Sequence, residues 1–431
     1  MAIYFEPARN VPIVEESDVV VCGGGPAGVA AAIAAARAGA RTRLLEMQGC
    51  LGGTWTAGLV SWIIESRKTG LMREITDELD RRGARGPGGE RDFAYDPESM
   101  KLLLDELVLE AGVQVQLYTH VVGTHVNDAG RLALALTESK TGRQAWAAKA
   151  FVDATGDGDL AAQAGCGFDL GHPETGQLQP MSLITLVTLE NREALWPYVC
   201  NQADTHNEAK KRLFDAMVSA GVTPSYAAPV LFHVRDNLYS LSSNHEYGVS
   251  GLSAADLTNA TLRGRAEMNR IVAALRSMGG PWEGMRLVAS AAHIGVREAR
   301  RVHGLYTVNT DDMLRGATFD DAVCRVTVGI DVHSTDPSKS KTFDPENSLR
   351  TKPYDIPLRS LIARDVQGLL MAGRCVSGDF LAHSSYRMTG TAVAMGQAAG
   401  IVAALAAQQH CLPQEVPWAD VRAALVRQGA S

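Results

Sequence analysis

A polar segment near the C-terminal end of the chain holds side chains suited to proton transfer and anion binding. His383, Tyr386 and Arg387 fall within five positions, between Cys375 and a run of small residues that starts at Thr391. A neutral histidine can take a proton from an alcohol or amine as a hydride leaves the substrate, and a tyrosine can contribute a phenol. An arginine can hold a carboxylate through two parallel hydrogen bonds. The alternative is structural, with Arg387 in an ion pair and His383 satisfied within a loop.

A glycine-rich turn near the start of the chain is typical of a dinucleotide site. Residues 19–22 are apolar and lead into Gly23-x-Gly25-Pro26-Ala27-Gly28. The first glycine permits a tight turn, the second lets the backbone approach a pyrophosphate, and the third lets a helix pack closely on a sheet. The pyrophosphate would lie at the N-terminus of that helix, where free N–H groups favour anions.

An acidic residue closes the next apolar run. Glu46 ends a predicted strand at residues 41–46, where its carboxylate can accept hydrogen bonds from ribose hydroxyls. A 2′-phosphate would be repelled there, which argues against NADP. A structural turn is the alternative for the glycines, but a strand, a helix and an acid in register favour the dinucleotide site.

Two further turns follow predicted strands. Gly52-Gly53-Thr54 comes shortly after Glu46, and Thr155-Gly156-Asp157 follows a predicted strand at residues 150–154. Small residues in the second turn allow close passage of the adenosine half of a dinucleotide, although a loop without a chemical role is the alternative. Asp157 and Asp159 could ligate a metal, but no third ligand is obvious and we predict no metal site.

The elements that must position these residues alternate between strand and helix. Residues 18–46 form a predicted β-α-β unit, and Asp96 with Pro97 marks the start of a helix that ends near residue 111. The alternation of strand and helix resumes near the C-terminal end, where we expect a buried strand at residues 369–372 and a helix of small residues at 391–408.

The middle of the chain has a different character. Strand-like stretches occur near residues 182–189, 230–241 and 325–332, and we expect helices at 253–278 and 284–301. The sequence therefore predicts an α/β protein with a discontinuous Rossmann-type domain, a parallel sheet flanked by helices. Residues 1–165 and 350–431 would form this domain, and residues 166–349 an inserted α+β substrate or cap domain.

Several charged residues of the middle segment have open roles. If residues 284–301 are helical, His293, Arg297 and Arg301 share one face, which could meet an anionic cofactor or an acidic substrate. An ion-pair network between the domains is the alternative that we favour. Asp331 and His333 alternate along a predicted strand, so they share a face that lines the active site or meets solvent.

These pieces together resemble the FAD-dependent oxidoreductases of glutathione-reductase-like topology, which are distantly similar to fumarate reductase flavoproteins. The similarity rests on the motifs above and on residues 153–159, 293–301, 372–375 and 396–400, in the family's order. Relatives commonly carry a histidine at the position matched by Phe380 and a proline near Thr389, so the loop between Cys375 and Thr391 departs from the pattern.

The resemblance implies a placement for FAD. Gly23, Gly25 and Gly28 would hold its pyrophosphate, Glu46 the adenosine ribose, and the Gly52-Gly53-Thr54 turn would border the flavin. Gly373 and Arg374 would end the strand that meets FAD, and Asp379 would lie near the ribityl chain. The helix that starts near Thr391 would direct its N-terminus at the flavin N1/C2=O edge, where reduced flavin carries negative charge.

Composition excludes several classes of protein. The net charge of −7 gives no basic footprint for nucleic acid. The seven cysteines are widely spread, and no two are spaced as C-x-x-C, which argues against a disulfide framework, an iron–sulfur cluster or a zinc site. No apolar run is typical of a signal peptide or a membrane span, so we expect a cytoplasmic protein.

The sequence thus predicts an FAD enzyme that transfers a hydride between a small polar organic substrate and flavin N5, with a dehydrogenase or an oxidase favoured. The electron acceptor stays open among oxygen, a quinone and a partner protein, and so does a homo-oligomeric state. A monooxygenase also stays open. Two further alternatives are a flavoprotein electron-transfer subunit that needs a partner and an NAD-dependent dehydrogenase that uses the glycine motif alone.

Overall fold

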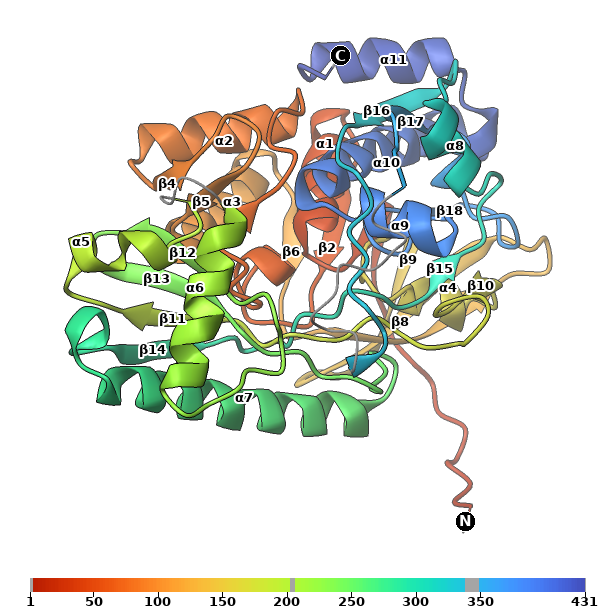
Figure 1. Ribbon diagram of the computed structural model, residues 1–431. Coiled ribbons are helices and arrows are strands. Elements are labelled where there is room, and N and C mark those ends of the chain that lie inside the picture. Colours follow the sequence, from red (N-terminus) through yellow and green to blue (C-terminus); the bar gives the residue numbers. More distant parts are fainter. Residues whose placement is uncertain (1–2, 202–205, 338–348, 431) are drawn as a thin grey trace.

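A seven-stranded sheet organises the N-terminal part of the chain, and a strand from the C-terminal part joins it. The computed structural model describes residues 3–201, 206–337 and 349–430. The strand order is β6-β2-β1-β9-β8-β7, with β18 also paired to β9 (Figure 1). The bounds are β1 Ile13–Cys22, β2 Thr42–Leu45, β6 Gln114–Gln116, β7 His120–Val126, β8 Leu132–Ser139, β9 Gly142–Asp153 and β18 Leu369–Met371.

The parallel strands of this sheet end at one edge. β1 runs parallel to both β2 and β9, with Cys22 opposite Leu45 and Asp153. β18 is parallel to β9, with Met371 opposite Asp153. Because carboxyl ends of parallel strands meet at the same edge, the segments that follow these four strands are brought together.

Helices cover the sheet and pack closely because their contact residues are small. α1 (Pro26–Arg37) begins with proline at its first turn, and α10 (Thr389–Gln409) crosses it. A Cβ added to Gly400 would come within 2.0 Å of the Ala31 carbonyl oxygen, so only glycine permits this approach. The helices α2 (Leu71–Arg81), α3 (Pro97–Glu110) and α11 (Trp418–Arg427) complete this part (Figure 1). Asp96 caps α3, as predicted.

The middle of the chain builds a second, antiparallel sheet with its own core. Its order is β12-β13-β11-β14, and Val187, Leu213 and Ile271 are among the buried residues beneath it. In Figure 1 the helices α6 and α7 lie along this sheet, below and to the left of the first sheet. The bounds are β11 Thr185–Thr188, β12 Val230–Arg235, β13 Leu238–Ser242, β14 Arg286–Ser290, α6 His206–Ser219 and α7 Ala254–Ser277.

Short elements connect the two parts. Three small sheets pair β5 with both β3 and β4, β10 with β15, and β16 with β17. Their bounds are β3 Trp62–Ile63, β4 Arg85–Gly88, β5 Phe93–Tyr95, β10 Phe168–Asp169, β15 Arg301–Val302, β16 Ala322–Val326 and β17 Tyr354–Pro357. The short helices are α4 Asp159–Gln163, α5 Arg192–Leu195, α8 Thr310–Arg315 and α9 Phe380–Tyr386. Several apolar side chains of the segment between Val302 and Val332 pack into the core of the first sheet.

The helix predicted at residues 284–301 is wrong. This segment contains β14, which pairs with β11, and β15, which pairs with β10, and the chain between them is not helical. Gly295 and the β-branched Val288, Ile294 and Val296 are poor helix formers, and pairing at the edge of the second sheet stabilises the extended form.

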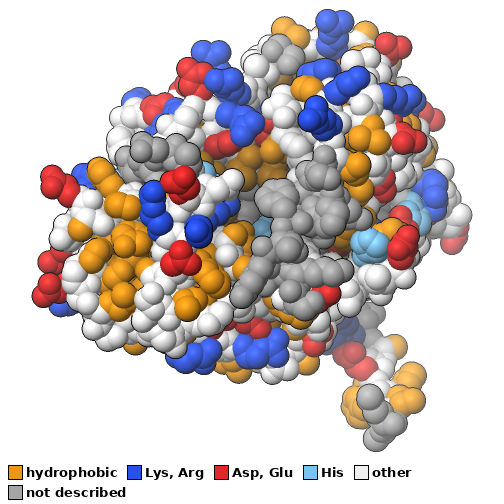
Figure 2. All heavy atoms as spheres, in the orientation of Figure 1, with side chains coloured by type: hydrophobic (Ala, Val, Ile, Leu, Met, Phe, Trp, Pro, Cys, Tyr) orange, Lys and Arg blue, Asp and Glu red, His pale blue; other side chains and the backbone are white. Residues whose placement is uncertain are grey.

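Charged residues of both signs cover the face shown in Figure 2, where lysine and arginine are interspersed with aspartate and glutamate. Within the described part of the chain, one helix, α10, is long and apolar enough to cross a membrane, and most of it is buried inside the protein.

Candidate active site at the carboxyl ends of the parallel strands

One cavity, with a volume of about 520 Å³, runs past the ends of the parallel strands. Segments that follow β1, β2, β9 and β18 line it, and so do residues of the second sheet and of α6. The predicted cofactor residues that line it are Gly23, Gly25, Pro26, Ala27, Glu46, Gly53, Thr54, Thr155, Gly156, Asp157, Gly373 and Arg374.

The first turn has the geometry that the glycine motif predicts. Gly23 has φ of +98°, in the left-handed region. A Cβ on Gly28 would lie 1.7 Å from the Gly23 carbonyl oxygen, so this position must be glycine for the helix to leave the sheet so closely. A Cβ on Gly25 would meet nothing within 4 Å, because it would enter the cavity. Open space at that point matches the approach of a pyrophosphate.

Glu46 follows β2 and is buried beside the glycine turn. Its carboxylate accepts hydrogen bonds from the backbone N–H groups of Gly24 and Gln48. Burial raises its pKa above the ordinary value of a glutamate. Each oxygen of a carboxylate can accept more than one hydrogen bond, so the acid can still receive ribose hydroxyls from the cavity.

The Gly52-Gly53-Thr54 turn lies against the glycine loop. Gly52 and Gly53 have φ of +101° and +51°, and a Cβ on Gly53 would lie 3.0 Å from Cα of Gly25. Gly52 does not line the cavity, and a Cβ on it would meet the side chains of Thr56 and Leu104. Cys50 lies nearby and its thiol contacts the hydroxyl of Thr56 at 3.7 Å.

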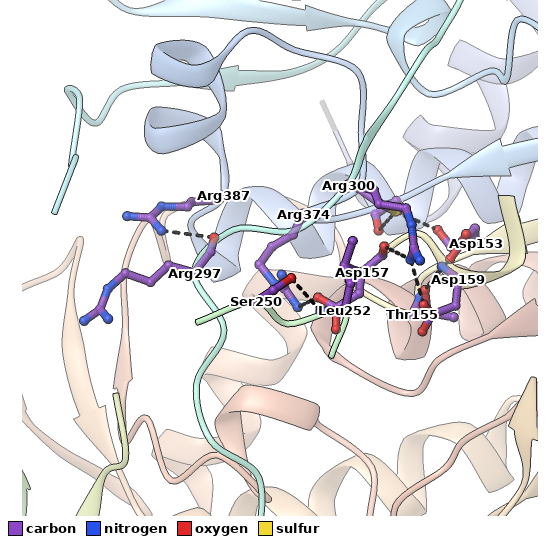
Figure 3. A network of polar contacts seen from close by, with 12 residues as sticks. Asp153, Thr155, Asp157, Asp159, Ser250, Leu252, Arg297, Arg300, Arg374 and Arg387 are labelled. Carbon is purple, nitrogen blue, oxygen red and sulfur yellow. Dashed lines mark hydrogen bonds and ion pairs between the residues drawn. The ribbon is translucent and has the colours of Figure 1, made fainter. Parts of the chain in front are cut away.

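The turn after β9 is held by a buried carboxylate. Asp153 accepts hydrogen bonds from the backbone N–H and the hydroxyl of Thr155 and from the N–H of Ala161. The next acid, Asp157, pairs with Arg374 at 2.8 Å, which joins this turn to the segment after β18 (Figure 3). Arg300 donates to the carbonyl of Asp157 and completes the network.

The N-terminus of α10 also faces the cavity. The helix begins at Thr389, two residues before the predicted start, and Met388, Thr389 and Ala392 line the cavity. Thr391, two residues further along the helix than Thr389, is fully buried. Asp379 does not line the cavity, because its carboxylate caps α9 and accepts hydrogen bonds from Thr310.

These residues fit FAD on two independent observations. Gly25 leaves open space where the pyrophosphate would lie. In addition, Nη1 of Arg374 and the hydroxyl of Thr389 are buried and have no hydrogen-bond partner among the described residues. Both residues line the cavity, so a polar group bound there would satisfy them.

A second group of polar residues lines the cavity beyond the strand ends. Arg297, Asp331, His333 and Arg387 lie here, and the ring of Tyr226 contacts that of His333 in a tilted arrangement, with centroids 5.7 Å apart and an interplanar angle of 50°. Arg387 donates to the carbonyls of Arg297 and Asp331 at 3.1 and 2.6 Å. Figure 3 shows the side chains of Arg297 and Arg387 pointing the same way, away from Asp157 and Arg374.

Burial and mutual repulsion set the charge states of this group. Burial lowers the pKa of His333 to about 4, and the nearby Arg297 acts in the same direction. The pKa of Arg387 falls to about 10, chiefly through burial. Burial alone would raise the pKa of Asp331, but His333 and the two arginines outweigh it and hold the pKa well below its usual range. His333 is therefore neutral at pH 7, between an ionised carboxylate and two cations.

The predicted catalytic residues separate into two sets. Arg387 lines the cavity, whereas His383 and Tyr386 are fully buried within α9 and do not. Tyr386 donates its hydroxyl hydrogen bond to the carbonyl of Val376 at 2.7 Å. Both ring nitrogens of His383 lack a side-chain or backbone hydrogen bond among the described residues, and burial holds its pKa well below the ordinary value.

Sequence reasoning missed Tyr226, Lys210, Trp62 and Phe232, which also line the cavity. No motif marks them, because they come from separate segments that only the packing of the second sheet brings together. Ser182 also lines the cavity. Gln179 accepts a hydrogen bond from the backbone N–H of His333 at 3.0 Å.

Several known proteins are similar to this chain. Dihydrolipoyl dehydrogenase of Trypanosoma brucei brucei is 33% identical over 125 residues, which cover 28% of this chain and 26% of that enzyme. A geranylgeranyl bacteriochlorophyll reductase-like protein of Thermoplasma acidophilum is 12% identical, with a TM-score of 0.46 and coverage of 96% of this chain and 83% of that one. The flavin-dependent brominase Bmp2 is 14% identical, with a TM-score of 0.47 and the same coverages.

The profile of one family, described as FAD dependent oxidoreductase, matches residues 18–425. Because this match spans nearly the whole chain, the protein belongs to the FAD dependent oxidoreductase family, and its cofactor is FAD.

Proposed function

We propose that the protein is an FAD-dependent dehydrogenase or oxidase that moves a hydride between a small polar organic substrate and the flavin. One observation supports this above all: a single cavity is lined both by the FAD-cradling turns and by Arg297, Asp331, His333 and Arg387. A substrate held by the second group would lie next to the flavin end of the cofactor. FAD, when bound, accepts or returns the hydride at its isoalloxazine ring.

His333 is the residue that we assign to proton transfer. It is neutral at pH 7, so it can accept the proton of an alcohol or amine as the hydride leaves. Its Nε2 lies 3.6 Å from Oδ2 of Asp331, and its backbone N–H is fixed by Gln179, so the ring has a defined orientation. We prefer His333 to His383 because His333 lines the cavity and His383 does not.

Arg387 keeps a role in this proposal, as a positioning residue. Its two hydrogen bonds to the carbonyls of Arg297 and Asp331 fix the two segments that carry the polar group. Tyr386 and His383 precede it on α9 and pack behind the cavity, where they support this position. Oxygen, a quinone or a partner protein would take the electrons from the reduced cofactor.

The first experiment is an absorption spectrum of the purified protein. Bands near roughly 375 and 450 nm would report the flavin, and anaerobic addition of candidate alcohols, amines and acids should bleach the band at longer wavelength. His333→Gln should retain FAD but slow bleaching, and His125→Gln, at an exposed position of β7, is the matched control. Flavin that no organic donor reduces would contradict the proposal.

A further inference from the structure

We propose that the substrate is a small organic acid and that Arg297 binds its carboxylate. This inference rests on the proposed function, because it names the substrate class of the same cavity. It starts from an arginine whose guanidinium is anchored on one side only and from the excess of positive charge around it.

The guanidinium of Arg297 is held in place by neutral groups. Its Nη1 donates to the carbonyl of Pro180 at 2.6 Å and to the hydroxyl of Ser182 at 2.9 Å. Its Nε and Nη2 make no hydrogen bond with any residue in the described ranges, and no described carboxylate pairs with it within 4.0 Å. A guanidinium presents its donors in a rigid fork that matches a carboxylate, so the open side of Arg297 is a preformed half of such a pair.

Among the described residues, carboxylates do not balance the positive charges around Arg297. Arg387 and Lys210 line the same cavity, and Asp331 is the carboxylate within electrostatic reach of all three cations. Asp331 is already engaged by Arg387 and His333. Lys210 forms no ion pair with a described residue. Three cations facing one occupied carboxylate in a buried cavity favour an anionic ligand, since unpaired buried charge is costly.

FAD itself does not account for this charge. Its pyrophosphate belongs at the N-terminus of α1, and Arg374 near that turn is paired with Asp157. Arg297 and Arg387 point away from this pair in Figure 3. They lie with the residues of the second sheet that line the cavity beyond the cofactor turns.

Other residues that line the cavity are apolar and could contact an apolar portion of the same ligand. Trp62 and Phe232 both line it, and their rings stack with centroids 4.2 Å apart and an interplanar angle of 4°. Ile184 and Val230 line the same cavity. The geometry therefore fits an acid with a short aliphatic or flat aromatic portion better than a highly hydroxylated molecule.

The test uses the FAD-loaded protein and matched pairs of ligands that differ in charge alone. Benzoate against benzamide, and acetate against acetamide, are titrated by calorimetry. We expect each acid to bind at least about tenfold more tightly than its amide. Arg297→Gln should remove this preference while leaving the affinity for the amide unchanged, and Arg297→Lys should retain part of it. Arg276→Gln, an exposed arginine on α7, is the control and should change neither affinity.

Each outcome decides the inference. Equal affinity for acid and amide, or binding of neither pair, would overturn it, and so would an Arg297→Gln protein that still prefers the acids. If Arg297→Gln does not fold with FAD, the preference for acid over amide is compared between Arg297→Lys and the parent protein instead. Calorimetry does not depend on turnover, so a protein that binds acids but is never reduced by an organic donor would contradict the proposed function alone.

Discussion

The imidazole of His333 faces the carboxylate of Asp331, with Nε2 and Oδ2 3.6 Å apart, at the wall of the cavity that the glycine-rich turns also line. The ring also contacts Tyr226 and His245, with centroids 5.7 and 5.0 Å away, and Arg297 lies close enough to lower its pKa. A histidine surrounded in this way is a neutral base over most of the working pH range.

We predict that kcat/KM for oxidation of the substrate falls as pH decreases through about 4, the pKa of His333 in the free enzyme. Protonation below this pH removes the base. His333→Gln should lower kcat by about 10²- to 10⁴-fold and abolish this limb of the profile. A pH–rate profile of the two proteins checks the prediction, and an unchanged acid limb in His333→Gln would assign it to another group.

Gly25 and Gly28 should respond differently to alanine although they belong to one motif. A methyl at Gly25 enters the cavity, so Gly25→Ala should fold normally and lose FAD affinity by about tenfold or more. A methyl at Gly28 would clash with the Gly23 carbonyl, so Gly28→Ala should lose roughly 1–3 kcal/mol of stability even without FAD. Urea unfolding of the FAD-free proteins, together with FAD titration, separates the two effects.

Asp153 should make stability depend on pH. Burial raises its pKa to about 6 in the folded protein, above the value of about 4 expected when it is unfolded. Between these values the folded state holds a proton that the unfolded state has lost, so this group makes the protein less stable as pH rises from 4 to 6. The expected change is about 2–3 kcal/mol. The free energy of unfolding in urea, measured between pH 4 and 6, should change less with pH in Asp153→Asn than in the parent protein. The same dependence on pH in both proteins would refute the prediction.

The crossing of α1 and α10 should not tolerate a larger residue at Gly400. The added methyl would come within 2.0 Å of the Ala31 carbonyl, which belongs to the rigid backbone of α1. We expect Gly400→Ala to cost roughly 1–3 kcal/mol and to lower the melting temperature. Thermal unfolding measures this loss, with Gly25→Ala as the glycine control. A Gly400→Ala protein as stable as the parent would show that the helices can separate without cost.

The cofactor turns could be predicted because their signals are local. Glycines at 23, 25 and 28, the acid at 46 and the Thr155-Gly156-Asp157 turn each follow a buried strand, and parallel strands place such turns at one edge. The start of α3 at Asp96 followed from cap chemistry in the same way. Asp379 shows the limit of this reasoning, since its carboxylate caps a short helix that the sequence did not predict.

The polar end of the cavity could be predicted only in part. Arg387, Asp331 and His333 were candidates from the sequence and line the cavity, but their meeting with Arg297 depends on long-range packing. His293 and Arg297 are four residues apart, which suggested a helix face, but pairing of β14 with β11 holds the start of this segment extended. Arg297 reaches the cavity from the chain between β14 and β15, Lys210 from α6, and Tyr226 from the loop between α6 and β12. Spacing in the sequence carries no information about such a convergence.

The last strand of the first sheet has a consequence for biosynthesis. β18 and α10 belong to the final quarter of the chain, yet β18 pairs with β9 and α10 packs on α1. During translation, β1, α1 and β9 emerge from the ribosome well before β18 and α10 are synthesised. The alanine-rich surface of α1 therefore stays exposed until α10 has emerged. The lining of the cavity is complete only after Ala392 has emerged, which makes cofactor loading a late event.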